Sequence, residues 1–148
     1  MRSLLKGRKK MVKKRQTVSS LKNKIVPVFS KYVRLRDCLL TTGSIEYGEC
    51  ISCGNQFEYK DLDAGHFIPK HNANLFSERG VNAQCRYCNS FKHGNQFEYS
   101  LGLIERYGKD APMELRAEAR QYKKFTVPEL EQMLVEFKSK IRELEERC

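Results

Sequence analysis

Two Cys-x-x-Cys pairs constrain this chain more than any other feature of its sequence. The first pair is Cys50 and Cys53, the second is Cys85 and Cys88, and 31 residues lie between the pairs. Each pair presents two thiolates on one tight turn, and two such turns supply the closed tetrahedral ligand set that a structural zinc ion requires. The alternative, four unrelated buried thiols, is disfavoured by this spacing. The sequence therefore predicts a four-cysteine site for a structural Zn²⁺.

The other two cysteines do not belong to that set. Cys38 is expected to be a small core residue of a helix, and Cys148 an exposed thiol. No stretch approaches the roughly 20 apolar residues of a membrane span, and the first residues lack the apolar region of a signal peptide. We therefore expect a cytoplasmic protein with no membrane partner, in which metal binding explains the cysteines better than disulfides do.

Positive charge is concentrated at the beginning of the chain. Of 28 Lys and Arg residues, 13 precede Asp37 and no acidic residue does, within a formal net charge of +10. Such a run attracts a polyanion through phosphate contacts and counterion release, which favours nucleic acid as the partner. A solvated basic tail with another use is the alternative. We interpret residues 1–18 as a flexible basic arm, with these residues expected to contact DNA: Arg8, Lys9, Lys10, Lys13, Lys14 and Arg15.

An amphipathic helix is expected before the first cysteine pair. Within residues 19–48, apolar residues recur at intervals of three and four from Leu21 onward, until the breaker and linker at 41–48. Pro27 either kinks this helix or delays its start. A chain of 148 residues has room for one modest core, so this helix is expected to pack on the same domain as the cysteines.

Residues 49–95 are expected to form the compact core. The segments 55–59 and 62–68 look extended, and 85–93 suits the first turns of a helix that opens on the second cysteine pair. The remaining residues, 96–148, are helical in pattern. The expected fold class is therefore α+β.

The last helix has a sharp expected start. Thr126 and Glu129 form a capping box with a proline in the first turn, a combination that favours helix initiation. Apolar residues then alternate at spacings of four and three, the pattern of a coiled-coil seam. Few heptads are available, so packing within the chain and dimerisation stay as alternatives. The stripe consists of Leu130, Leu134, Phe137, Ile141 and Leu144.

A longer run around the second cysteine pair resembles a known family. After CISCG, the run DAGHFIPKHNANLFSERGVNAQCRYCNSFKHGN resembles the HNH, or ββα-metal, nucleases with zinc knuckles, and is most similar to the phage NinG (Rap) recombination family. The resemblance covers residues 49–95 and implies a small ββα-metal core with a four-cysteine zinc site, flanked by helices. It also implies a structure-specific endonuclease that cuts branched DNA, such as Holliday junctions and D-loops, in phage recombination. Composition and spacing alone indicate only a nuclease-like zinc domain.

The resemblance assigns roles to four residues. His66 corresponds to the general base, and a neutral imidazole can take a proton from water at cytoplasmic pH. Asn82 corresponds to the middle Asn of the motif, which holds the loop and orients the base. Asn89 occupies the position of a metal ligand on the helix, and His93, four residues further on the same helical face, is a second candidate ligand. The implied catalytic cation is Mg²⁺ or Mn²⁺, which binds the scissile phosphate.

One position departs from the family pattern. Many relatives carry Asp immediately before the catalytic His, whereas here Gly65 stands there and the acid is Asp63. In a regular strand an offset of three places the Asp63 and His66 side chains on opposite faces. Either Gly65 marks a bulge that turns Asp63 towards the metal, or Asp63 orients a metal ligand without binding the metal itself. We favour the metal role.

Three further residues carry weaker signals. Arg79 and Lys92 are candidates for binding DNA phosphates, although each is also compatible with a solvated charge. His71 is typical of a loop histidine, and we assign it no role.

Three functions remain open at this point. The first is a metal-dependent endonuclease on branched DNA, and the second is a non-catalytic zinc-ribbon module that binds DNA through its basic arm. A third, an RNA-binding zinc protein, is disfavoured because no aromatic platform of the RNP type is visible. Junction cutting needs two symmetric incisions, so we expect a homodimer. Phage or host recombination proteins are expected as further partners.

Overall fold

The computed structural model describes residues 15–147 and consists mainly of helices with two small antiparallel sheets. It confirms the predicted α+β class. Five of the predicted arm residues, Arg8, Lys9, Lys10, Lys13 and Lys14, lie outside the described part of the chain, as does Cys148. The elements, in chain order, are α1 (Val18–Thr42), β1 (Tyr47–Glu49), β2 (Gln56–Glu58), the 3₁₀ turn η1 (Tyr59–Asp61), β3 (Leu62–His66), β4 (Val81–Cys85), the π-helical turn η2 (Tyr87–Phe91), α2 (Gln96–Tyr107), α3 (Ala111–Ala119) and α4 (Val127–Glu146).

Capping residues define both ends of the first helix. The Thr17 hydroxyl accepts a hydrogen bond from the Ser20 backbone N–H at 3.1 Å, which is an N-cap. At the other end Gly43 adopts the left-handed conformation with φ 77°, and its N–H donates to the Leu39 carbonyl at 3.0 Å. Pro27 lies inside the helix, so it does not delay the start. The predicted helix is confirmed.

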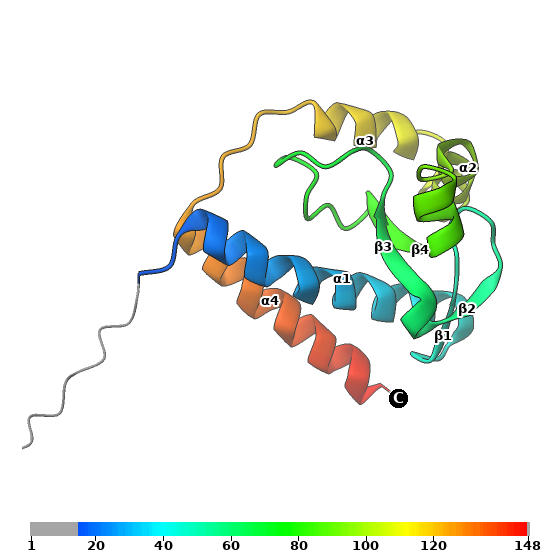
Figure 1. Ribbon diagram of the computed structural model, residues 1–148, viewed down its shortest axis with the longest axis horizontal. Coiled ribbons are helices and arrows are strands. Elements are labelled where there is room, and N and C mark those ends of the chain that lie inside the picture. Colours follow the sequence, from blue (N-terminus) through cyan, green and yellow to red (C-terminus); the bar gives the residue numbers. More distant parts are fainter. Residues whose placement is uncertain (1–14, 148) are drawn as a thin grey trace, which may run out of the picture.

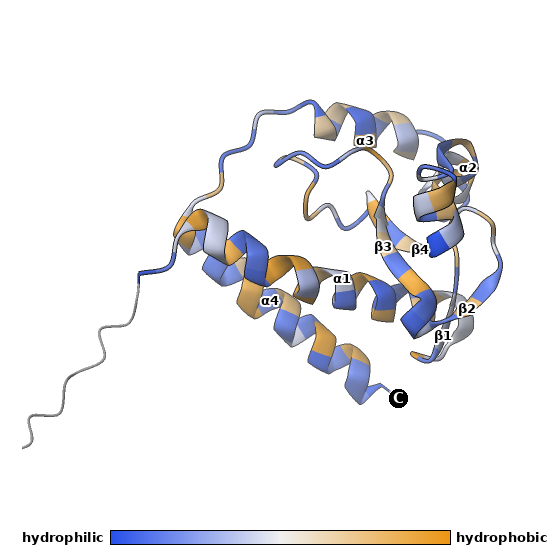
Figure 2. Ribbon diagram, viewed as in Figure 1, coloured by the Kyte–Doolittle hydropathy of each residue, from blue (hydrophilic) through white to orange (hydrophobic). Residues whose placement is uncertain are grey.

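The apolar stripe of α4 packs within the chain. Leu130, Phe137 and Ile141 are buried, and the Phe137 ring lies 4.9 Å from the Phe29 ring of α1, centroid to centroid. The two helices lie side by side and run in the same direction (Figure 1), and each interleaves hydrophobic with hydrophilic residues (Figure 2). The capping box of Thr126 and Glu129 is present with both of its hydrogen bonds. Because the seam is occupied by α1, a homodimer of this chain has to use another surface.

A long hairpin, β3 and β4, forms the centre of the fold. Its register pairs Leu62 with Cys85 and His66 with Val81 without interruption. Strand β4 was not among the predicted elements, and all five of its residues are buried, including the polar Asn82 and Gln84. The polar side chains are tolerated there because each makes hydrogen bonds inside the protein.

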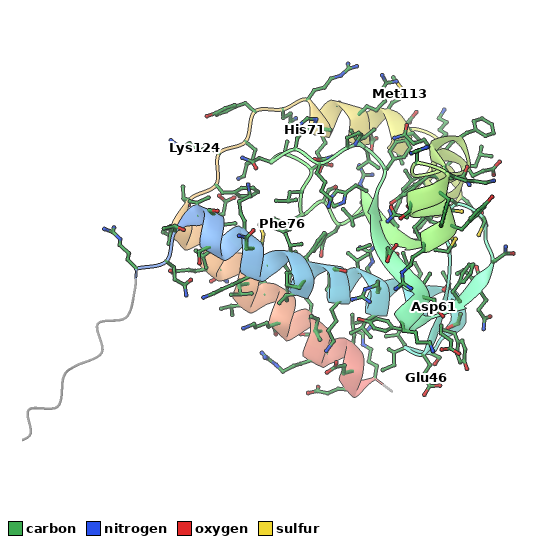
Figure 3. All side chains as sticks on the ribbon, viewed as in Figure 1. Glu46, Asp61, His71, Phe76, Met113 and Lys124 are labelled. Carbon is green, nitrogen blue, oxygen red and sulfur yellow. The ribbon has the colours of Figure 1, made fainter. Side chains whose placement is uncertain are left out.

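The hairpin lies between two helical layers. α1 and α4 lie on one side of it, and α2 and α3 lie on the other (Figure 1), where Tyr99, Leu103 and Leu115 pack around Phe67. The loop between the strands contributes to both layers: Phe76 lies towards α1 and His71 towards α3 (Figure 3). Among the residues described, no helix is long and apolar enough to cross a membrane.

Candidate functional site

The four predicted zinc ligands come together at the end of the hairpin. The sulfur atoms of Cys50, Cys53, Cys85 and Cys88 all lie within 4.8 Å of one another, and three of the four cysteines are buried. In residues 15–147 they form the one group of three or more His, Cys, Asp or Glu side chains close enough to hold an ion. Four soft thiolates in a closed set fit a structural zinc, which would join the turn after β1 to the turn after β4. Cys38 is fully buried in α1, as predicted.

Gln84 explains the glycine before His66. Its amide nitrogen donates to the Ser52 hydroxyl at 2.8 Å and to the Gly94 carbonyl at 2.7 Å, so the side chain is held in place beside β3. A Cβ atom on Gly65 would lie 2.2 Å from the Gln84 Oε1 and 3.1 Å from its Cβ, which leaves no room for an aspartate there. The unbroken pairing of β3 with β4 also contradicts the bulge that we considered for Asp63.

His66 is held by one ring nitrogen and unpaired at the other. Its Nε2 lies 3.0 Å from the Leu75 carbonyl oxygen, which can only accept, so Nε2 carries the proton and donates. In the neutral ring Nδ1 is therefore the acceptor. This atom is buried and has no hydrogen-bond partner within residues 15–147. The loop between the strands thus sets the tautomer and leaves a basic nitrogen for another molecule.

The surroundings keep His66 neutral. Burial lowers its pKa below the ordinary 6.5, and the nearby charge of Lys70 lowers it further. The hydrogen bond to the Leu75 carbonyl acts in the opposite direction but does not reverse the shift. At cytoplasmic pH the ring is consequently in the form that can accept a proton.

Three of the predicted site residues line one cleft. The cleft has a volume of about 280 Å³, and His66 of β3, Asn89 of η2 and the exposed His93 lie along it. Lys70 lines the same cleft, although the sequence analysis gave it no role. The sequence feature that could have identified Lys70 is its position four residues after His66, directly after the proline that ends the extended segment. On its other side His66 faces a larger hollow of about 430 Å³ with basic residues Arg34, Lys70 and Arg86 in its lining.

Asp63 orients the Asn89 side chain through a hydrogen bond. The Asn89 amide nitrogen donates to the Asp63 Oδ2 at 3.3 Å, and the Arg86 Nε lies 3.6 Å from the Asp63 Oδ1. A carboxylate engaged on both sides orients the Asn89 amide and leaves Asn89 Oδ1 as the oxygen for a cation. Of the two roles considered for Asp63, the geometry favours the supporting one.

The predicted helix over 85–93 is correct only for its middle part, residues 87–91. Cys85 ends β4, and η2 is a single turn from Tyr87 to Phe91. His93 follows it with φ 49°, so Asn89 and His93 do not share a helical face. They meet in the cleft because the chain reverses there: the Gly94 N–H donates to the carbonyls of Cys88 and Asn89 at 3.0 and 3.1 Å.

Asn82 lies in a buried network beneath β3. Its amide nitrogen donates to the Arg79 carbonyl at 2.8 Å, and its oxygen accepts from Arg106 at 3.0 Å. Tyr99 links this network to the strand, because its hydroxyl accepts from Asn82 and donates to the Gly65 carbonyl at 2.6 Å. Asn82 therefore holds the loop before β4, and it lies outside the cleft that His66, Asn89 and His93 line.

We expect Tyr99→Phe to lower the free energy of unfolding by about 1–3 kcal/mol, because it leaves the buried Asn82 amide and Gly65 carbonyl without their shared partner. Urea unfolding of the purified protein measures this. Tyr122→Phe, on a ring that is 90% exposed, is the matched control and should change the free energy by less than about 0.5 kcal/mol. Equal midpoints for the two variants would contradict the role given to the hydroxyl.

The remaining candidates for DNA contacts lie at the surface. Arg79 pairs with Glu114 of α3 at 2.8 Å, so it is not a free cation for a phosphate. Lys92 is exposed, with its Nζ 5.5 Å from the centroid of the Tyr87 ring, and Arg15 is exposed before α1. His71 is exposed in the loop, on the side of α3.

Comparisons with known proteins agree on one family. The family model described as bacteriophage lambda NinG protein matches residues 1–147. Protein ninG of Escherichia phage lambda is 33% identical over 97 residues, which cover 64% of this chain and 47% of that protein. Protein ninG of Salmonella phage P22 is 34% identical with the same coverage. The chain spans about half the length of the curated relatives it matches, and no solved structure matches it.

The match of the family model extends over both cysteine pairs, the β3–β4 hairpin and the residues of the cleft. The chain therefore belongs to the bacteriophage lambda NinG family.

Proposed function

We propose that this protein is a metal-dependent endonuclease that hydrolyses phosphodiester bonds in branched DNA, with His66 as the general base. The observation that carries the proposal is the state of the His66 ring. Nε2 is committed to the Leu75 carbonyl, Nδ1 is an unpaired acceptor, and burial keeps the ring neutral. A core histidine with a purely structural role has no need for an unpaired buried nitrogen, which costs free energy.

The chemistry needs little beyond these groups. His66 Nδ1 takes the proton of a water that attacks the phosphorus, and this water reaches the ring through the cleft. The Asn89 oxygen, oriented by Asp63, and the His93 ring are the groups that would hold a divalent cation. When bound, Mg²⁺ or Mn²⁺ supplies positive charge that stabilises the phosphate and the leaving oxygen. Lys70 adds a fixed positive charge beside the attacked phosphate.

The charge distribution supports DNA as the substrate. The chain carries a net charge of +10, and 13 of its basic residues precede Asp37, the first acidic residue of the sequence. Arg34 and Arg86 add basic groups to the hollow next to His66. We place the reaction in phage recombination, in the host cytoplasm, because the relatives are phage proteins and branched DNA is the intermediate of recombination.

The decisive experiment compares a synthetic four-way junction with a linear duplex of the same sequence. Purified protein is incubated with each, with magnesium present or left out. A chelator is avoided because it would also remove a thiolate-bound zinc. Magnesium-dependent paired cuts in the junction support the proposal. Binding to both DNAs without cuts under any metal would instead make the protein a zinc-containing binding module.

We expect cleavage to persist below pH 6.5. The lowered pKa of His66 means that the imidazolium forms, and the base is lost, only as the pH falls through a value under the ordinary 6.5. Single-turnover cleavage rates across pH at fixed magnesium locate this midpoint. Lys70→Gln removes a charge that lowers the pKa, so its midpoint should move upward, towards 6.5. A midpoint above 6.5 in the wild type would contradict the assignment of His66.

A further inference from the structure

Two exposed aromatic rings lie beside the candidate site and have no part in the proposed hydrolysis. Tyr87 and Phe91 are 60% and 77% exposed, and they are the first and last residues of η2. Their ring centroids lie 5.9 Å apart with an angle of 30° between the planes, so the rings are stacked on each other. Two large exposed rings in contact form an apolar patch on the surface, and such patches are features of interaction sites.

The charges around the two rings indicate which class of molecule would bind them. Residues 86–92 contain two basic residues, Arg86 and Lys92, and no acidic one. The Lys92 Nζ lies 5.5 Å from the centroid of the Tyr87 ring, and Arg86 is exposed immediately before that ring. Aromatic faces bordered by cations match a nucleotide, whose base stacks on a ring while its phosphate meets a positive charge.

The turn η2, which carries the two rings, also carries a residue that lines the cleft. Asn89 lies between Tyr87 and Phe91 in the sequence, and its side chain lines the cleft together with His66. Arg86 contacts Asp63, the residue that orients Asn89. The two rings line neither the cleft nor the hollow beside His66, and at two residues from Asn89 they lie on the other side of this turn from its side chain. A DNA strand in the cleft therefore meets the rings where it continues around η2.

We propose that Tyr87 and Phe91 form a stacking platform for an unpaired DNA base next to the cleft, an inference that rests on the proposed nuclease function. A base inside a duplex is covered on both faces by its neighbours, whereas an unpaired base in a single-stranded arm of branched DNA is exposed and can stack on protein rings. The platform thus favours branched or single-stranded DNA over linear duplex. The sequence shows no aromatic platform of the RNP type, and these two rings meet only through the single turn of η2.

The test measures binding separately from cleavage. All variants carry His66→Gln, so that the DNA is not cut. The probes are a blunt duplex and the same duplex with a single-stranded arm that contains 2-aminopurine, whose fluorescence is quenched when it stacks. We expect Tyr87→Ala with Phe91→Ala to weaken binding of the armed duplex about tenfold or more, with loss of quenching, and to leave binding of the blunt duplex unchanged. Tyr122→Ala, on another exposed ring, is the matched control.

Each outcome separates the platform from the nuclease. If the double variant keeps wild-type quenching and the same preference for the armed duplex, the platform is overturned, whether or not the wild type cuts junctions. If quenching and preference are lost while the wild type cuts no DNA, the platform stands and the proposed nuclease function fails. Tighter binding of a matched RNA arm than of the DNA arm, lost in the same variants, would overturn DNA as the occupant.

Discussion

Replacement of His66 by Gln is expected to lower the rate of junction cleavage by about 100-fold or more, which is the contribution of a positioned general base. The glutamine amide can still donate to the Leu75 carbonyl, as Nε2 does at 3.0 Å in the wild type, but it offers no nitrogen that accepts a proton. The loop is therefore expected to stay in place while the base is lost. Single-turnover cleavage of a labelled four-way junction measures the effect.

Two comparisons make the His66 result specific. Affinity for the junction, measured by electrophoretic mobility, should be unchanged in His66→Gln, because the variant alters proton transfer and not charge. His71→Gln serves as the matched control, since His71 lies in the same loop region but is exposed and outside the cleft. A His66→Gln protein that cuts the junction at the wild-type rate would show that the histidine is structural.

Loss of one zinc ligand is expected to unfold the centre of the protein. Cys88 is buried and its sulfur lies within 4.8 Å of the other three, so Cys88→Ser breaks a closed ligand set. Structural zinc contributes about 10–16 kcal/mol of binding free energy in zinc-finger peptides, which is comparable to the whole net stability of a domain, about 5–15 kcal/mol. We expect Cys88→Ser to lose bound zinc and the cooperative thermal transition, measured by elemental analysis and circular dichroism.

Cys38→Ala is the matched control for the zinc prediction. Cys38 is also a buried cysteine, but it packs against Leu62 and Ala83 rather than belonging to the cluster of four sulfurs. This variant should keep its zinc and its cooperative transition, with a modest loss of stability from the small cavity. Retention of both zinc and wild-type stability in Cys88→Ser would refute a structural role for the metal site.

The sequence alone determined the features that depend on neighbours along the chain. The spacing within each cysteine pair predicted two metal-binding turns, and the capping residues Thr126 and Glu129 predicted the start of α4, because turns and caps are built from residues three or four apart. The meeting of the two turns in one cluster is a tertiary feature, since 31 residues separate them. The helix of residues 18–42 and the α+β class followed from the period of the apolar residues in the same way.

Three further features were decided only by the tertiary structure. The burial of both faces of strand β4 was not predictable from its sequence, because only the partners that Asn82 and Gln84 meet elsewhere in the fold make their burial tolerable. The stripe of α4 fitted a dimer seam as well as an internal one, until α1 was seen to cover it. The state of His66 depends on a carbonyl nine residues away, at Leu75, which the loop brings to within 3.0 Å.

The physical reason for this division lies in the range of the forces. Helix capping and thiolate pairs act within a turn of the chain, so a short stretch of sequence contains all of their partners. Burial, hydrogen bonding of buried polar groups and the pKa of a buried histidine depend on atoms that long loops and packed layers bring together. The sequence therefore determined which residues were available for metal and for chemistry, and the packing of the β3–β4 hairpin between its two helical layers decided which of them meet in the cleft.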